Sequence, residues 1–103
     1  MEICFLRSAK AKYQAAAQMN FRFSKHAESE LVLRRILREF VEEVLRQPQQ
    51  IVPERPPKKA YQSKMDFGGG RIFLLRVIVD DTIEPAMVVT LYRTKKINKY
   101  WKP

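Results

Sequence analysis

The sequence contains very little cysteine and histidine, with one residue of each among 103. Cys4 alone cannot form an internal disulfide, and Cys4 with His26 cannot supply the four ligands of a structural zinc site. No apolar run approaches the roughly 20 residues that a transmembrane helix needs, and the apolar stretch near the N-terminus is too short for a signal peptide. These absences predict a cytoplasmic protein that binds no membrane, metal or cofactor.

Motifs for nucleophilic catalysis and nucleotide binding are absent as well. The chain has no serine or cysteine nucleophile motif. Its three glycines, at 68–70, fall between two strand-like runs, so they predict a hairpin turn and not a phosphate-binding loop. Asp80 and Asp81 are adjacent and should point apart, which argues against a metal pair. Any chemistry must therefore come from other charged and aromatic side chains.

Positive charge is what the chain has in excess. The net charge is +9 at pH 7, from 20 Lys and Arg against 11 Asp and Glu. Residues 53–103 hold eleven of the cations and five of the acids, and the last eleven residues hold five cations and no acid. Charge gathered at one end is typical of a surface that meets phosphate or an acidic protein. A solvated tail that serves only solubility is the alternative.

The length predicts one domain, preceded by a short N-terminal segment. Residues 1–18 are rich in alanine and show no amphipathic stripe, so we expect an extension or a loosely packed helix there. Met19 is an alternative start, because the residues after it read like the opening of a domain. We expect residues 19–103 to form a single α+β domain.

The clearest periodic signal lies between residues 33 and 45. A short strand at 20–24 precedes it, Ser24 is a suitable N-cap, and Gln47-Pro48 ends the helix. The pattern predicts either one helix over 25–46 or two helices with a bend near 35–38. The apolar residues at helical spacing are Leu33, Ile36, Leu37, Phe40, Val41, Val44 and Leu45.

Three strand-like runs, at 60–67, 71–79 and 86–93, follow the proline-rich segment 51–59, which predicts a loop or an edge strand. The middle run is almost wholly apolar, so it should be a central strand covered on both faces. Short connections predict antiparallel pairing. The expected fold is an N-terminal helix or helix pair packed on one face of a three- to four-stranded antiparallel sheet.

Two residues stand out as candidates for chemistry. Arg76 lies in the apolar middle run, where a charge is costly to bury unless it is paired. It is either a structural arginine paired with a helix carboxylate such as Glu30, or a guanidinium that binds phosphate in a groove. His26 lies in the first helical turn, where an imidazole beside a bound anion could act as general acid or base. A histidine without a role is the alternative.

The C-terminal cluster is the third candidate, because its cations alternate with aromatic residues. Such a pattern suits RNA, since cations neutralise phosphates and rings stack on unpaired bases. Aromatic packing beside solvated lysines is the alternative. The candidate nucleic-acid-binding residues are Tyr92, Thr94, Lys95, Lys96, Lys99 and Trp101.

Several short motifs occur in the order found in a small bacterial family of unknown function. Over about residues 20–101 the chain resembles this family, which is similar to the RelE/ParE-type toxins of type II toxin–antitoxin modules. The motifs are Phe23-Ser24-Lys25-His26-Ala27, the segment 41–45, Tyr61-Gln62-Ser63, the segments 75–80 and 89–94, Lys96-Ile97 and Lys99-Tyr100-Trp101.

The chain departs from this family at two places in the helical region. Glu30 stands where the family usually has arginine, and Arg34-Arg35-Ile36 stands where it has Arg-Gly-Ile. The missing glycine argues against a bend between two helices.

The resemblance implies about four antiparallel strands with helices on one face, and a metal-independent mRNA endoribonuclease held inactive by an antitoxin protein. It implies that His26 is the acid or base, that Arg76 and Arg93 stabilise the phosphate, and that Tyr61 or Tyr100 assists proton transfer. We then expect His26, Arg76 and Arg93 to share one concave surface. The alternative is a non-catalytic module that binds an acidic protein or nucleic acid through the basic C-terminal surface.

Overall fold

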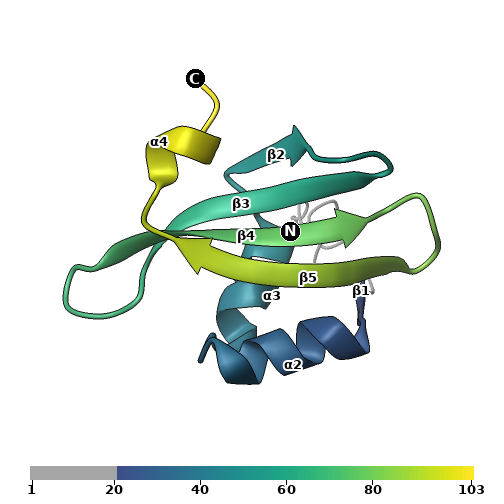
Figure 1. The fold of residues 1–103 in the computed structure, drawn as a ribbon, viewed down its shortest axis with the longest axis horizontal. Coiled ribbons are helices and arrows are strands. Elements are labelled where there is room, and N and C mark those ends of the chain that lie inside the picture. Colours follow the sequence, from purple (N-terminus) through teal and green to yellow (C-terminus); the bar gives the residue numbers. More distant parts are fainter. Residues whose placement is uncertain (1–20) are drawn as a thin grey trace, which may run out of the picture.

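The computed structural model of the protein describes residues 21–103, so the predicted extension at 1–18 lies outside the described residues. Figure 1 shows a sheet with helices on both of its sides. In chain order, the elements are β1 (Phe21–Phe23), α2 (Lys25–Leu33), α3 (Arg38–Arg46), β2 (Gln50–Pro53), β3 (Lys58–Asp66), β4 (Ile72–Asp80), β5 (Ala86–Thr94) and α4 (Ile97–Tyr100).

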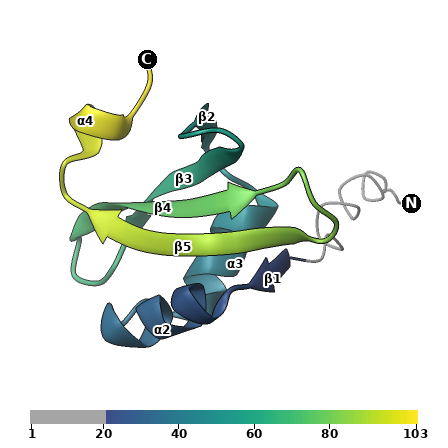
Figure 2. The same ribbon diagram turned by 45° about the vertical axis from the view of Figure 1, so that its right-hand side comes forward.

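The sheet has five strands in the order β1-β5-β4-β3-β2. The α+β class is confirmed, but the prediction of three or four antiparallel strands is wrong, because β1 adds a strand that runs parallel to β5. Figure 2 shows β1 beside β5, although the two strands are far apart in the sequence. The prediction paired strands that are neighbours along the chain. It therefore missed the pairing of β1 with β5, because two helices and three strands lie between them in the sequence.

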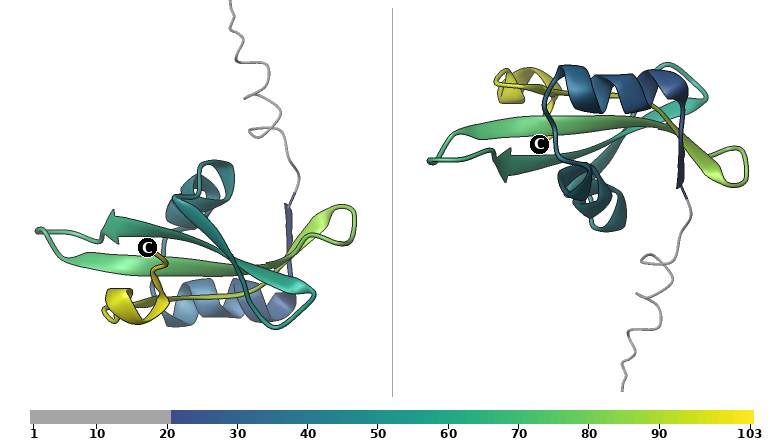
Figure 3. Two further views of the ribbon diagram at one scale, coloured as in Figure 1. Left: turned by 90° about the horizontal axis from the view of Figure 1, so that it is seen from above. Right: turned by 90° about the horizontal axis from the view of Figure 1, so that it is seen from below.

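The three predicted strands form the antiparallel centre of the sheet. β3 pairs with β4 and β4 with β5, and the predicted glycine turn joins β3 to β4 with all three glycines at positive φ. The proline-rich segment supplies the edge strand β2. As predicted, β4 is buried over most of its length. Figure 3 shows α3 and α4 on opposite sides of the sheet, while α2 runs beside β5.

The helical region is two helices, α2 and α3, because the chain turns at Arg34 and Arg35. Arg35 takes a left-handed conformation (φ 52°), which an L-residue adopts at a cost of about 1–2 kcal/mol. The N–H of Ile36 donates to the carbonyl of Leu31 and that of Arg35 to the carbonyl of Val32, which is the hydrogen-bond pattern of a Schellman cap. The expectation that a missing glycine argues against the bend is therefore wrong, because Arg35 adopts the left-handed conformation that glycine would usually supply.

The bend also breaks the apolar stripe that predicted the helix. Leu33 and Leu37, at either end of the turn, are 74% and 60% exposed. Ile36, Val41, Val44 and Leu45 stay on the predicted face and are buried against the sheet, and Phe40 is partly buried there. Residues at helical spacing share one face only along a single continuous helix. The apolar stripe is therefore interrupted where α2 ends and α3 begins in a new direction.

Glycine at position 35 should therefore be tolerated or favoured. Arg35→Gly removes the left-handed strain, and the greater flexibility of glycine in the unfolded chain offsets part of that gain. We expect the free energy of unfolding to stay level or rise by up to about 1 kcal/mol, as measured by urea denaturation. The control is Val32→Gly at an exposed position of α2, which should lower it by roughly 0.3–0.5 kcal/mol. Equal losses in the two variants would contradict the cap.

Candidate nucleic-acid interface

Arg76 and Arg93 lie on opposite faces of the sheet. In the β4–β5 register Arg76 is opposite Tyr92, and Leu75 is opposite Arg93. Directly opposite residues share a face, and Leu75 belongs to the main core beneath α2 and α3. Arg93 is therefore on the helix side and Arg76 on the outer face. The expectation that these two residues share one concave surface is wrong, because side chains alternate along a strand with a period of two.

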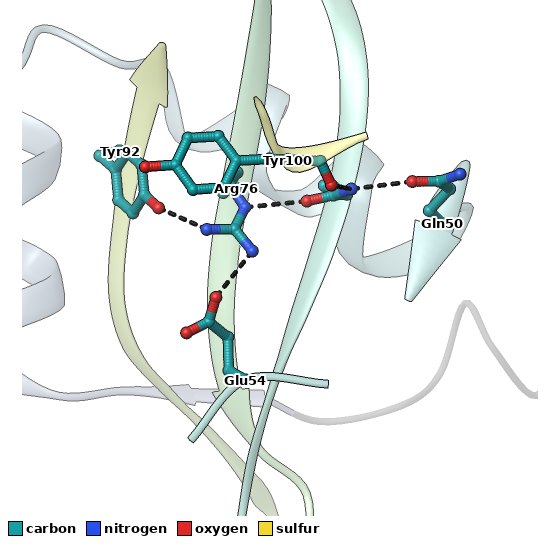
Figure 4. A network of polar contacts seen from close by, with 6 residues as sticks. Gln50, Glu54, Arg76, Tyr92 and Tyr100 are labelled. Carbon is teal, nitrogen blue, oxygen red and sulfur yellow. Dashed lines mark hydrogen bonds and ion pairs between the residues drawn. The ribbon is translucent and has the colours of Figure 1, made fainter. Parts of the chain in front are cut away.

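The Arg76 guanidinium is buried, with only 3% of the residue exposed, and it has partners on three sides. Figure 4 shows its bonds: Nε donates to the Gln62 side chain at 2.8 Å, one terminal nitrogen donates to the Tyr92 hydroxyl, and the other donates to Glu54 at 2.8 Å. The Tyr100 ring lies over the guanidinium, 4.2 Å from its centroid. Burial raises the pKa of Tyr92, so its hydroxyl stays neutral.

The same network attaches the C-terminal segment to the sheet. The Gln62 amide nitrogen donates to the Tyr100 carbonyl at 3.2 Å and to the Gln50 side chain at 2.8 Å. Gln50 in turn bonds both the N–H and the carbonyl of Lys102. Arg76 is thus bonded as a structural arginine would be. Its acidic partner is Glu54 in the connection between β2 and β3, and not the helix residue Glu30.

The other predicted catalytic residues lie apart from Arg76 and from one another. His26 is 63% exposed at the start of α2, with Nε2 3.7 Å from Glu30. Tyr61 is on the helix side of β3, buried in the main core, where its hydroxyl donates to Asp81. Tyr100 is on the outer face over Arg76. The described structure does not assemble these residues with Arg93 at one site.

A basic cleft lies between the end of α2 and the end of β5. Its volume is about 600 Å³. Four of its seven lining residues are cations, two from each side, and none is acidic. We call this set the basic cleft: Arg34 and Arg35 after α2, Arg93 and Lys95 in and after β5, with Leu33, Phe73 and Thr94.

Aromatic rings hold two cations of the basic cleft in place. The Arg93 guanidinium lies 4.7 Å from the Phe67 ring centroid and 4.9 Å from that of Phe73. The Lys95 ammonium lies 5.6 Å from the Phe73 centroid. Within residues 21–103 neither cation forms a salt bridge, nor does Arg35, whereas Arg34 pairs with Glu30. Three of the four charges are therefore not cancelled by a carboxylate of the described chain.

The predicted C-terminal cluster is divided between the two faces. Arg93 and Lys95 belong to the basic cleft, whereas Tyr92 and Tyr100 contact each other on the outer face. The Thr94 hydroxyl lines the cleft and accepts the N–H of Lys96. Lys96 and Lys99 are exposed where the chain leaves β5 and forms α4, and Trp101 follows them.

Sequence reasoning missed Arg34 and Arg35 as site residues. Two adjacent cations at the end of a helix complement the partial negative charge of its last carbonyls, so they gave no sign of a ligand site. Their proximity to Arg93 depends on where α2 lies along β5, which is a tertiary contact. The one local signal was the replacement of the expected glycine by Arg35.

Comparison of the chain with protein-family models, curated proteins and solved structures gave no match. Among residues 21–103, no three His, Cys, Asp or Glu side chains are grouped as metal ligands would be. No helix in this part of the chain is long and apolar enough to cross a membrane.

Removal of the Arg76 guanidinium should destabilise the fold more than removal of the Arg93 guanidinium in the basic cleft. Arg76→Met leaves the buried Gln62 side chain without its donor and takes the support from beneath Tyr100. We expect the free energy of unfolding to fall by about 2–3 kcal/mol, as measured by urea denaturation. The matched control Arg93→Met, on the other face, should cost less than about 1 kcal/mol. A smaller loss for Arg76→Met than for Arg93→Met would contradict the structural role.

The buried Tyr61 hydroxyl should make stability depend on pH in the alkaline range. Burial first, and the Asp81 carboxylate second, raise the pKa of Tyr61 from 10.0 to about 12. Between these values the unfolded chain loses the Tyr61 proton while the folded chain keeps it, so the free energy of unfolding falls as pH rises.

The limiting slope for this one proton is about 1.4 kcal/mol per pH unit. Urea unfolding of Tyr61→Phe, compared with the unsubstituted protein at pH 9 to 12, should show a shallower decline, because phenylalanine has no proton to lose. Parallel declines would show that Tyr61 does not contribute to the alkaline loss.

Proposed function

We propose that the protein is a non-catalytic RNA-binding module whose basic cleft holds the phosphate backbone. One observation carries the proposal: four cations from two separate segments line one cleft, no acid lines it, and only Arg34 is paired with a carboxylate of the described chain. Arginine presents a planar set of donors that fits two phosphate oxygens at once, and lysine adds a compact charge beside it. This cleft is the arrangement among the described residues that best suits a phosphate.

The way the cations are held supports binding of an anion. A carboxylate partner fixes a cation but also cancels its charge, as Glu54 does for Arg76. The rings of Phe67 and Phe73 fix Arg93 through their electron-rich faces and carry no net charge. Arg93 is therefore positioned in advance and keeps its attraction for phosphate, which lowers the entropy lost on binding.

The residues of the cleft support binding more than cleavage. Attack by a 2′-hydroxyl needs a general base and a general acid near the phosphate. The lining includes no His, Asp, Glu or Tyr. His26 is at the opposite end of α2, roughly 12 Å along the helix axis from Arg34 at 1.5 Å per residue. Among the two hypotheses from the sequence, the non-catalytic module is the one that this geometry favours, with RNA as the ligand.

RNA affinity should depend on the cations of the cleft and not on net charge alone. The double variant Arg93→Gln/Lys95→Gln should bind a fluorescent, unstructured RNA oligonucleotide at least about tenfold more weakly by anisotropy, since two phosphate contacts are lost. Each lost contact should also reduce the slope of log affinity against log salt by about 0.7. The charge-matched control is Arg22→Gln/Arg55→Gln, two exposed cations outside the cleft, which should bind nearly as the unsubstituted protein does.

Equal weakening in the two double variants would mean that binding follows net charge, and the cleft would not be the site. The RNA recovered from the binding reactions should run intact on a denaturing gel. Cleavage that disappears in His26→Ala would contradict the non-catalytic part of the proposal and favour the endoribonuclease.

A further inference from the structure

Trp101, the one tryptophan of the chain, lies outside both hydrophobic cores. The main core lies between the sheet and the helices α2 and α3, and the smaller one surrounds Ile78 on the outer face, with Tyr92 packed against it. Trp101 is half-buried directly after α4, a helix with no buried residue. Because tryptophan offers the largest apolar area of any side chain, leaving it outside the cores forgoes a stabilising contribution. Core packing does not account for its position.

The backbone on both sides of Trp101 is nevertheless fixed. Its own N–H donates to the Ile97 carbonyl at 2.8 Å, and the Gln62 amide donates to the preceding carbonyl, that of Tyr100. The Gln50 side chain accepts the N–H of Lys102 at 3.2 Å and donates to its carbonyl. Gln62 and Gln50 thus hold the residues on either side of Trp101, and the Ile97 carbonyl holds Trp101 itself. The indole is presented from a rigid backbone and not from a loose terminus.

Cations surround the aromatic residues of this segment. The Lys64 ammonium lies 4.1 Å from the Trp101 ring centroid, and that of Lys99 lies 5.3 Å from the Tyr100 centroid. No salt bridge to Lys64, Lys99 or Lys102 occurs within residues 21–103, and all three lysines are exposed. We call Lys64, Lys99, Tyr100, Trp101 and Lys102 the C-terminal platform. It offers two aromatic rings, each beside a lysine that has no carboxylate partner within residues 21–103.

The chain itself connects the C-terminal platform to the basic cleft. Arg93 and Lys95 line the cleft, and Lys96 immediately precedes α4. Figure 1 shows this short path from the end of β5 into α4. Exposed Lys95 and Lys96 therefore continue the positive charge from one surface to the other. A polyanion that enters the cleft meets further cations where the chain leaves the sheet.

We propose that Trp101 is a stacking site for an unpaired nucleobase, so that the RNA bound by this protein is single-stranded. This inference rests on the proposed function and names its substrate class. Every base has a π-face that can stack on an indole, and the flanking lysines would neutralise the adjoining phosphates. In a duplex the bases are already stacked on one another and cannot reach the ring. The cleft supplies charge for either form of RNA, whereas the platform selects the unpaired form.

Intrinsic fluorescence tests the stacking without any substitution, because Trp101 is the only tryptophan. Titration with an unstructured single-stranded RNA should quench its emission as a base stacks on the indole. Inorganic tripolyphosphate, which carries charge but no base, should compete for the cleft without quenching. Equal quenching by tripolyphosphate, or none by the RNA, would overturn the inference.

Substitution of Trp101 tests the preference for single strands. Trp101→Ala should lower the affinity for single-stranded RNA by about 5- to 150-fold, the range that follows from loss of one base–aromatic stack. The affinity for a duplex of the same sequence should stay unchanged. Trp101→Phe, which keeps a ring, should recover part of the loss. Leu37→Ala, an exposed apolar residue away from the platform, is the control and should bind both forms normally. Circular dichroism establishes that each variant is folded.

The outcomes separate this inference from the proposed function. If the Arg93→Gln/Lys95→Gln variant loses RNA binding while Trp101→Ala binds single strands normally, the basic cleft is the binding site and the proposed stacking site is wrong. Equal losses for single strand and duplex in Trp101→Ala would also overturn the preference. If the unsubstituted protein binds no RNA, both proposals fail together.

Discussion

The outer face of the sheet depends on the buried guanidinium of Arg76. This one group, on β4, reaches Gln62 on β3, Tyr92 on β5 and Glu54 between β2 and β3, and it lies under the Tyr100 ring of α4. An apolar side chain could fill the same space, but it could not direct its neighbours. Hydrogen bonds have fixed geometry, so they determine where α4 rests although that helix has no buried residue.

Because the Arg76 guanidinium is already bonded within the fold, unpaired positive charge must lie elsewhere on the molecule. Its Glu54 partner and its burial leave it poorly placed for phosphate, and the charge available to a ligand must come from other residues. Strand alternation puts Arg93 on the opposite face, where the left-handed turn after α2 brings Arg34 and Arg35 to the same cleft. The turn that ends α2 thus also completes the cleft.

Features set by neighbours in the sequence were predictable, and features set by long-range contacts were not. The central strands, the glycine turn and the Ser24 cap follow from local patterns, and the structure confirms each of them. β1 was predicted as a strand, but its parallel partner was not, because nothing local links it to β5. Arg76 was recognised as anomalous, yet its acidic partner Glu54 lies in the proline-rich segment, which gave no sign of an ion pair. The basic cleft was missed because its two halves meet only in the folded chain.

The partners of the cations distinguish those that hold the fold from those available to a ligand. Arg76, Lys59 and Arg38 meet the carboxylates of Glu54, Asp81 and Glu28, so each charge is matched within the described chain. Arg93, Lys64 and Lys99 meet the rings of phenylalanine, tryptophan and tyrosine, and within residues 21–103 they have no carboxylate partner. A ring attracts a cation through its quadrupole, which restrains the side chain but leaves the field of the cation largely intact at a distance. The excess of positive charge in this protein is therefore localised. Cations paired with carboxylates link elements of the fold, while cations that meet a ring and no carboxylate of the described chain gather at the basic cleft and the C-terminal platform. A phosphate backbone would find both fixed geometry and uncompensated charge at these two surfaces.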